Sequence, residues 1–558
     1  MAIVHKLNES YSAIEADSRT LTKINDFLKV QIPGAYFDPL VKRGFKSPYH
    51  YFASEQNGML LVLNGHLDVL GSFGINKEIL QSEYNELEIE MFYESIKSTL
   101  PFEPYDYQLK AFKESILKVK QINKMCTSSG KSYTISLIAE FFRQKKKKGL
   151  LLVPNINLLT QFKNDIKDYN LLELYNDTHT IGGGSTSKNF DCSLTISTWQ
   201  SLQNWKDELD KIDYIICDEA HRFKSDVTSS IVSESTNCRY KFGFTGTLPE
   251  DPIGKMQLLG LFGMPKTYIT SKELIERGLA TPIFINTLIL NYSTEDKHLF
   301  RTIEKNQYNK QLMFIKEHEK RNELIVNLTN KILKIGNTLV LGQHIEHLKD
   351  MYLSIMKKLY PEVEEIQNKD ITGKKSFEFQ EQYGVYYISG SDDAKTRELT
   401  RKILEEDLFK ITFDDDSIIR LHGNKEIELG DKKEFISNLK IGDIIDNKII
   451  SSIEIQNQVL VSGYQLLSTG VNIKKLYNVI LASPLKSYTT ITQSLGRGMR
   501  LYKDKDKFMV FDIVDNFGLK KPSGIFYKQY QQRCANSYYP EEFPVTETFV
   551  ELDLLKNN

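Results

Sequence analysis

The chain has 558 residues, 41% of them hydrophobic and 26% charged, as in a globular protein of about three or four domains. No apolar run reaches the ~20 residues of a spanning helix, and the polar start does not fit a signal peptide. A net charge of −1 neither supports nor excludes a nucleic-acid partner. The five scattered cysteines lack CxxC and Cys/His spacings, which argues against a zinc site or a disulfide framework. We expect a protein of a reducing cytoplasm, without membrane contact.

The first ~98 residues predict a small α+β domain. Alternating hydrophobic residues at 49–52 and 58–64 predict strands, and the pattern over 76–96 predicts helices. Three cations, with tyrosines nearby, precede the first of these strands: Lys42, Arg43 and Lys46. They could bind duplex phosphates, although the solvated edge of a hairpin carries lysine equally often.

The segment Lys124-Met-Cys-Thr-Ser-Ser-Gly-Lys-Ser132 stands before an amphipathic stretch and predicts a phosphate-binding loop. Small residues let backbone amides surround phosphate oxygens, and the start of the following helix favours the same negative charge. The loop residues in this role are Thr127, Ser128, Ser129 and Gly130. Lys131 would reach the β/γ-phosphates and Ser132 would hold Mg²⁺. Met125 replaces the first glycine of the strict pattern, which leaves a polar turn before a helix as the alternative.

A second motif, DYIICDEAH at 213–221, leads a buried strand into two acids and a histidine. At the end of such a strand, Asp218 can hold Mg²⁺ while Glu219 positions or deprotonates the attacking water. Alone, such an acid pair is usually only a solvated strand end. Because they follow the phosphate loop at an interval that suits a doubly wound sheet, the two motifs together predict ATP hydrolysis.

Residues from about 407 to 458 consist of short β runs separated by Asp, Asn and Gly turns, which predicts a compact all-β module. Their cadence resembles the N-terminal part of intein and Hedgehog-type self-processing domains. The residues for self-splicing are missing, since Glu405-Glu-Asp407 stands at the upstream junction and Gln458 follows Asn457. We expect an inert insertion that stays in the chain, and an intact mass equal to the whole sequence would test this.

In this order the motifs resemble those of superfamily 2 helicases of the DEAH-lettered kind. PYDYQ at 104–108 is similar to the family's adenine-reading segment, which implies that Tyr105 and Gln108 contact the base. FTGT at 244–247 resembles the coupling motif. Its Thr245 and Thr247, with His221, would transmit the state of the γ-phosphate. In the remaining motifs, Gly470 would contact the nucleotide. The residues that the resemblance implies as nucleic-acid contacts are Thr160, Gln161, Thr198, Trp199, His344, Ser468 and Thr469.

The last motif, QSLGRGMR at 493–500, follows STGVN as it does in the family. Gln493, Arg497 and Arg500 lie three or four residues apart and would share one face of a helix. Two cations on that face suit the charge that develops on a transferring phosphoryl group. A basic surface face is the commoner meaning of such spacing, and the position after STGVN favours the catalytic role.

A closer resemblance is to the UvsW type of recombination and fork-remodelling DNA helicase of T-even phages. The shared segments include AYFDP at 35–39, STWQS at 197–201 and VFDIVDNFG at 510–518. The resemblance implies an α/β chain with two RecA-like doubly wound parallel-sheet domains. The implied layout is a DNA-binding α+β domain at 1–98, RecA-like domains at 99–288 and 289–535 with the all-β insertion in the second, and a tail at 536–558.

The resemblance also implies ATP bound between the two RecA-like domains and a branched or duplex DNA partner, such as forks, D-loops, R-loops and four-way junctions. It suggests a monomer in the cytoplasm of the infected host, with phage recombination and single-strand-binding proteins as partners. RNA-remodelling helicases share every motif named here. The motor subunit of a restriction system is a further alternative, but no PD…ExK-like nuclease pattern follows Asp515. A nucleotide-binding scaffold without turnover should lack Glu219 or the pair Arg497 and Arg500. All three residues are present, which argues against this alternative.

Overall fold

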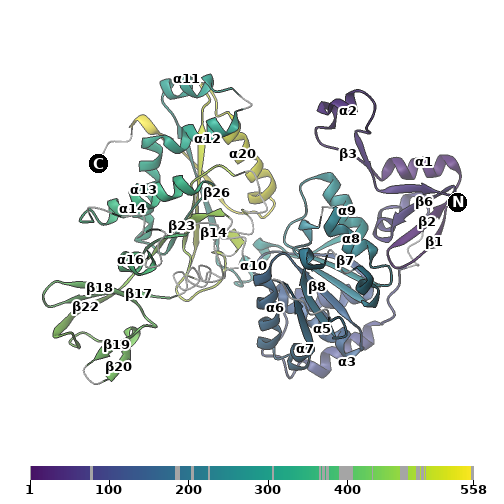
Figure 1. Ribbon diagram of the computed structural model, residues 1–558, viewed down its shortest axis with the longest axis horizontal. Coiled ribbons are helices and arrows are strands. Elements are labelled where there is room, and N and C mark those ends of the chain that lie inside the picture. The colour runs from purple at the N-terminus through teal and green to yellow at the C-terminus, as the bar shows by residue number, and fades with distance from the viewer. Residues whose placement is uncertain are drawn as a thin grey trace. The chain divides into compact units, whose positions relative to one another are not determined.

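The computed structural model describes most of the chain and divides it into two compact units, Met1–Thr270 and Ser271–Asn558 (Figure 1). The described residues are 2–75, 80–182, 189–202, 206–223, 226–304, 307–363, 366, 371, 376–388, 406–429, 432–464, 475–485, 491, 495–496 and 498–554. Among them, no helix combines the length and the apolar character needed to cross a membrane.

The first unit begins with a small antiparallel sheet in the order β1-β2-β6-β5. Its strands are β1 Ile3–Lys6, β2 Tyr11–Glu15, β5 Ala53–Gln56 and β6 Met59–Leu63. Helix α1, Ser18–Phe27, starts at Asp17, whose side chain accepts a hydrogen bond from the Thr20 amide. Leu21 and Ile24 of this helix pack with Ile14, Leu60 and Val62 of the sheet into a separate core. A short hairpin of β3 Lys29–Gln31 and β4 Tyr49–Tyr51 carries α2, Pro39–Lys42.

The larger part of the first unit is a seven-stranded, entirely parallel sheet in the order β13-β7-β12-β11-β8-β10-β9. Its strands are β7 Lys120–Met125, β8 Gly149–Val153, β9 Thr178–Ile181, β10 Leu194–Thr198, β11 Tyr214–Asp218, β12 Tyr240–Thr245 and β13 Pro265–Ile269. All residues of β8 and β11 are buried, as in a parallel sheet covered on both faces. The helices are α3 Glu86–Ile96, α4 Asp106–Lys118, α5 Lys131–Gln144, α6 Ile156–Asp168, α7 Leu172–Asn176, α8 Asp226–Glu234 and α9 Pro252–Phe262.

The second unit is built on another parallel seven-stranded sheet, in the order β16-β23-β15-β24-β25-β14-β26. Its strands are β14 Ile283–Asn291, β15 Thr338–Gly342, β16 Val385–Ile388, β23 Val459–Gly463, β24 Asn478–Leu481, β25 Phe508–Asn516 and β26 Val545–Glu551. The helices are α10 Ser271–Glu276, α11 Thr294–Thr302, α12 Tyr308–Glu317, α13 Glu319–Leu333, α14 Ile345–Leu359, α16 Ser376–Tyr383 and α20 Ile525–Arg533. The two sheets confirm the predicted α/β class with two RecA-like domains.

Two features of the second sheet differ from the proposed layout. Strand β14 contains residue 288, where a domain boundary was proposed, and it pairs with β25 and β26 along its length. The segment 536–558, proposed as a tail, contributes the edge strand β26. Because most side chains of β26 are exposed, its sequence carries little of the hydrophobic alternation that marks a strand.

The predicted all-β insertion is present. Strands β17 Leu408–Phe413, β18 Ile418–His422, β21 Ile444–Ile445 and β22 Lys448–Gln456 form an antiparallel sheet, and β19 Glu426–Leu429 pairs with β20 Lys432–Phe435. Ile411, Phe413, Ile436 and Ile450 give the module its own core. Buried His422 bonds Glu381 at 3.0 Å and Gln458 at 3.1 Å, which fastens the module to the residues around its base.

Candidate ATPase site

Three loops of the first unit meet at one edge of the sheet. Strands β7, β12 and β11 are neighbours and run parallel, with Thr245 opposite Lys124 and Asp218 opposite Phe244. The loops that follow these strands therefore begin side by side at their carboxyl ends, where ligands of open α/β sheets bind. These loops carry the predicted phosphate loop, the coupling motif and the acid pair.

The phosphate loop turns sharply into helix α5. Gly130 has φ of +76° and stands at the start of the helix, and Ser128 also has a positive φ, +67°. An added Cβ at Gly130 would lie 2.3 Å from the Gln108 side chain, so both the backbone conformation and the space require glycine there. The start of α5 offers unpaired amides and a positive dipole end to an anion.

Side chains of the PYDYQ segment donate hydrogen bonds to the backbone of this loop. Gln108 donates through Nε2 to the Ser129 carbonyl at 2.9 Å and accepts from the Tyr105 amide at 2.9 Å. The Tyr107 hydroxyl donates to the same carbonyl at 2.9 Å, a contact that the sequence did not reveal. The Tyr105 ring is 48% exposed and stacks on Tyr107, which leaves it accessible to a planar base. Gln108 is almost fully buried and serves the loop in this structure.

Lys131 and the acid pair are electrostatically linked. Burial alone would raise the pKa of Glu219, but the hydrogen bond from His221 and the charge of Lys131 lower it below its ordinary value. Burial, together with the negative charge of Glu219, raises the pKa of Asp218. Glu219 has a left-handed backbone, with φ of +51°, which is uncommon for a residue other than glycine and typical of functional sites.

A cation would complete the surroundings of Asp218. Its Oδ1 atom is buried and has no hydrogen-bond partner among the described residues. A buried acceptor without a donor is costly unless something else occupies it, and carboxylate and hydroxyl oxygens are ligands that Mg²⁺ prefers. The Ser132 hydroxyl lies 2.7 Å from that of Tyr169, and a hydroxyl oxygen keeps acceptor capacity when it makes one bond. Ser132 and Asp218 thus suit a magnesium ion.

The coupling residues form one buried hydrogen-bonded chain. His221 Nδ1 lies 2.9 Å from the Thr245 hydroxyl, which donates to the Thr247 carbonyl at 2.6 Å. His221 Nδ1 also lies 3.3 Å from a carboxylate oxygen of Glu219. Between Thr245 and Thr247, an added Cβ at Gly246 would lie 3.5 Å from the Met125 carbonyl, so this loop touches the phosphate loop. The acid pair, the histidine and the threonine loop are therefore in mutual contact.

The predicted nucleic-acid contacts of the first unit differ in accessibility. Thr160 and Gln161 are exposed on α6. Thr198 is buried and its hydroxyl lies 2.9 Å from that of Ser201, while Trp199 packs edge-on against Phe223. The cations Lys42, Arg43 and Lys46 are exposed on the hairpin that carries α2.

In the second unit, His344 follows β15 and starts α14, and burial lowers its pKa. Arg500 lies just before β25, and its carbonyl accepts from the Thr281 hydroxyl at 3.1 Å and from Lys505 at 3.3 Å. Lys505 also donates to Gly498, so both residues hold the end of the arginine motif, a role that the sequence did not indicate. The residues Gln493, Arg497, Ser468, Thr469 and Gly470 lie outside the described part of the chain.

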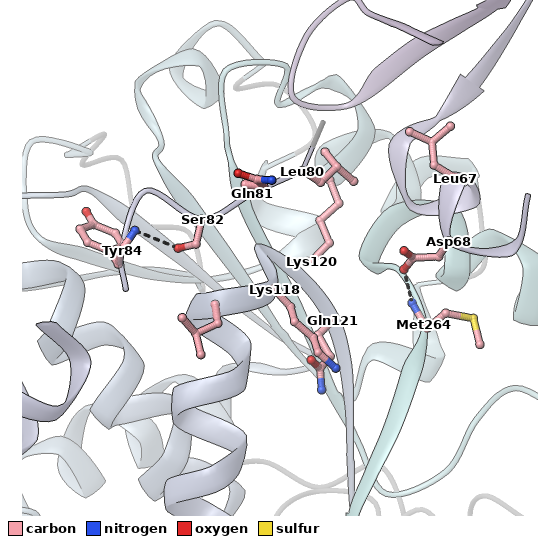
Figure 2. A pocket seen from close by; sticks show the side chains of 11 residues that line it. Leu67, Asp68, Leu80, Gln81, Ser82, Tyr84, Lys118, Lys120, Gln121 and Met264 are labelled. Atoms are coloured by element: carbon pink, nitrogen blue, oxygen red, sulfur yellow. Dashed lines mark hydrogen bonds between the residues drawn. The ribbon is translucent and has the colours of Figure 1, made fainter. Parts of the chain in front are cut away.

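A cavity of about 430 Å³ lies by the amino end of β7 (Figure 2). Its walls include Lys120, Leu80 and Ser82, and it is bounded by hydrogen bonds from Tyr84 to Ser82 and from Met264 to Asp68 (Figure 2). Lys120 is only 5% exposed, and burial followed by the charge of Lys241 lowers its pKa. None of the predicted site residues lines this cavity.

Sequence comparisons found known proteins that are similar to this chain. Residues 101–250 match the family model described as the res subunit of type III restriction enzymes. The chain is 26% identical over 546 residues to the ATP-dependent DNA helicase uvsW of Enterobacteria phage T4, covering 94% of this chain and 93% of that protein.

Two solved structures align with most of the chain. The crystal structure of T4 UvsW aligns over 98% of this chain and 99% of its own, at 23% identity and a TM-score of 0.42. A fragment of an HsdR subunit of a type I restriction enzyme from Vibrio vulnificus YJ016 aligns over 87% of this chain and 73% of its own, at 18% identity and a TM-score of 0.50, a likeness of fold alone. The whole-length sequence relative and the order of the motifs confirm the predicted resemblance to superfamily 2 helicases of the UvsW type.

Proposed function

We propose that the chain is an ATP-dependent DNA helicase or translocase that acts on branched DNA, such as forks, D-loops, R-loops and four-way junctions. The observation that carries this proposal is the meeting of Lys131, Asp218 and Glu219 at one sheet edge, where a buried Asp218 oxygen has no hydrogen-bond partner among the described residues. The name of the T4 relative supports DNA as the partner. Phage recombination and the cytoplasm of an infected host would be its setting.

Each residue has a defined role in the proposed reaction. The amides that start α5 bind the phosphates, and Lys131 neutralises the β/γ-phosphate oxygens. Ser132 and Asp218 would hold Mg²⁺, which supplies positive charge to the transferring phosphoryl group. Glu219, whose pKa is lowered, is ionised at neutral pH. It can orient the attacking water or accept a proton from it. From their motif, Arg497 and Arg500 would stabilise the charge that develops in the transition state, and Gln493 would assist them.

The buried chain from His221 through Thr245 to Thr247 is the proposed link between hydrolysis and movement. Glu219 touches His221, so a change at the γ-phosphate can reach the threonine loop through two contacts. Hydrolysis would then switch nucleic-acid contacts once per cycle, which moves the motor along a strand. These contacts should involve mainly the backbone of the strand, with little sequence preference.

The test is the rate of ATP hydrolysis with no nucleic acid, single-stranded DNA, a forked duplex, a four-way junction and matched RNA. We expect the branched DNAs to stimulate most. Lys131→Ala should abolish turnover, while Lys118→Ala, which removes the same charge from an exposed position of α4, should leave the rate unchanged. Stimulation mainly by RNA would favour an RNA-remodelling helicase. Hydrolysis that survives Lys131→Ala would disprove the site.

A further inference from the structure

The hairpin of β3 and β4 carries an ordered excursion, residues 32–48, whose tip is aromatic and exposed. At its base, the Ile32 amide donates to the Pro48 carbonyl at 2.8 Å. At its tip, Asp38 caps α2 by accepting from the Leu40 amide at 2.9 Å, and the Phe45 amide donates to the Leu40 carbonyl at 2.9 Å. These bonds fix the backbone, and with it the positions from which the side chains project.

The excursion and its flanking strand expose their large apolar side chains to an unusual degree. Phe37 is 83% and Phe45 is 79% exposed, the highest values of any phenylalanine in the described residues. The exposed large hydrophobic side chains between residues 36 and 51 are Tyr36, Phe37, Leu40, Phe45 and Tyr51. Scattered apolar side chains on a surface need no explanation, but five within sixteen residues of one hydrogen-bonded excursion and its flanking strand favour a binding surface.

Cations alternate with these aromatic rings. Residues 29–51 contain Lys29, Lys42, Arg43 and Lys46 against one acid, Asp38, in a chain whose net charge is −1. Lys46 pairs with Asp38 at 3.3 Å, whereas Lys42 and Arg43 make no ion pair with any described residue. Lys29 pairs with Asp26, just before this segment, and lies over the Tyr49 ring, 5.0 Å from its centre. Surfaces that bind single-stranded nucleic acid combine aromatic rings, which stack on the bases, with cations, which bind the phosphates. This segment carries both along its sequence.

We propose that this aromatic tip, Phe37 and Phe45 with Lys42 and Arg43 between them, binds the unpaired bases at a branch point of DNA. The rings stack on bases that have left the duplex, and the cations hold the adjoining phosphates. A linear duplex offers no unpaired base to the rings, so the tip discriminates branched from unbranched DNA. This inference rests on the proposed function and gives a physical reason why forks, D-loops and R-loops, which carry unpaired bases, should be preferred to a linear duplex.

The test compares Phe37→Ala/Phe45→Ala with the unchanged chain on a forked duplex that carries 2-aminopurine at the first unpaired position. We expect the double variant to bind the fork about 10- to 100-fold more weakly and to lose the fluorescence quenching that stacking causes. Its affinity for linear duplex and its basal ATP hydrolysis should stay unchanged. The control Phe549→Ala removes an exposed ring from β26 and should change none of these quantities.

A second variant separates stacking from charge. Lys42→Ala/Arg43→Ala should weaken binding to all DNAs alike and reduce the slope of log affinity against log salt by about 2. Equal fork binding and equal quenching by the Phe37→Ala/Phe45→Ala variant would overturn the inference. An anionic membrane is the other surface that exposed rings and cations could bind. If the Phe37→Ala/Phe45→Ala variant lost binding to phosphatidylglycerol vesicles but kept its fork binding, the inference would also be overturned. If the unchanged chain showed no stimulation by any DNA, the proposed function itself would fail.

Discussion

Two buried carboxylates, one in each sheet, have opposite surroundings. Asp515 in β25 accepts from Arg321 Nε at 2.7 Å, from Arg321 Nη2 at 3.2 Å and from the Tyr292 hydroxyl at 2.7 Å. Asp218 at the end of β11 has one buried oxygen without any described partner. The fully bonded acid stabilises its unit, whereas the acid left incomplete is available to a ligand. Hydrogen-bond completeness, more than burial, separates structural from functional acids here.

The variant Asp218→Asn tests whether the incompletely bonded acid serves the reaction and not stability. We expect the rate of ATP hydrolysis to fall about 10³- to 10⁴-fold, because an amide cannot replace the charge that the reaction needs. The free energy of unfolding should stay the same or rise, since the variant removes a buried charge whose Oδ1 atom has no hydrogen-bond partner among the described residues. Steady-state kinetics and urea unfolding of the same preparation would check both. A marked loss of stability would show that Asp218 is structural after all.

The corresponding change in the second unit, Asp515→Asn, should act on stability. It leaves the fully buried guanidinium of Arg321 without its counter-ion, and we expect the free energy of unfolding to fall by about 3–5 kcal/mol. Urea unfolding followed by circular dichroism, with hydrogen exchange to locate the loss in residues 271–558, is the measurement. The control is Arg321→Met/Asp515→Leu, which removes the whole pair and should be nearly neutral. Equal losses in both variants would contradict the pairing argument.

The coupling chain offers a smaller effect. Thr245→Val keeps the shape of the side chain and removes the hydroxyl that joins His221 to the Thr247 carbonyl. We expect stimulation of hydrolysis by DNA to fall about 10-fold and the free energy of unfolding to fall by about 1–2 kcal/mol. The matched control is Thr134→Val on α5, whose buried hydroxyl has no described partner, so its loss should be harmless. Unchanged stimulation in Thr245→Val would place the coupling elsewhere.

The sequence predicted the parts of the site whose chemistry is local. A phosphate loop needs small residues and a lysine at fixed spacing, and an acid pair must end a buried strand, so both can be read from short segments. The hold of Thr281 and Lys505 on the end of the arginine motif could not be predicted in this way. Thr281 bonds Met499 and Arg500 across more than 200 residues of sequence, and such contacts depend on strand order.

The fold shows the same division. The all-β insertion was predictable because turn residues and β-branched runs alternate within one short segment. Strand β26 was not, because an edge strand gains ladder hydrogen bonds while burying few side chains. The order of strands in the two sheets could not be predicted from the residues, because a hydrophobic run does not show which strands lie beside it.

The smallest effect concerns two lysines that lie opposite each other at the amino ends of β7 and β12, Lys120 and Lys241. Lys241 donates to the Val232 carbonyl at 2.8 Å, to the Ser235 carbonyl at 3.0 Å and to the Ser10 hydroxyl. Lys120 lines the cavity of Figure 2 and makes no hydrogen bond through its amine to any described residue. The comparison of Asp218 with Asp515 is thus repeated with cations.

Lys120→Met should raise the free energy of unfolding by about 1–2 kcal/mol at pH 7, whereas Lys241→Met should lower it. Burial lowers the pKa of Lys120 below its ordinary value, so between that lowered pKa and about 10.5 the unfolded chain binds more protons than the folded chain. The unchanged protein therefore gains stability as pH rises through this window, and the advantage of Lys120→Met should shrink towards pH 10. Tryptophan fluorescence can follow the unfolding of this unit, because Trp199 and Trp205 both fall within residues 1–270. A lower free energy of unfolding in Lys120→Met would contradict the prediction that this buried amine destabilises the unit.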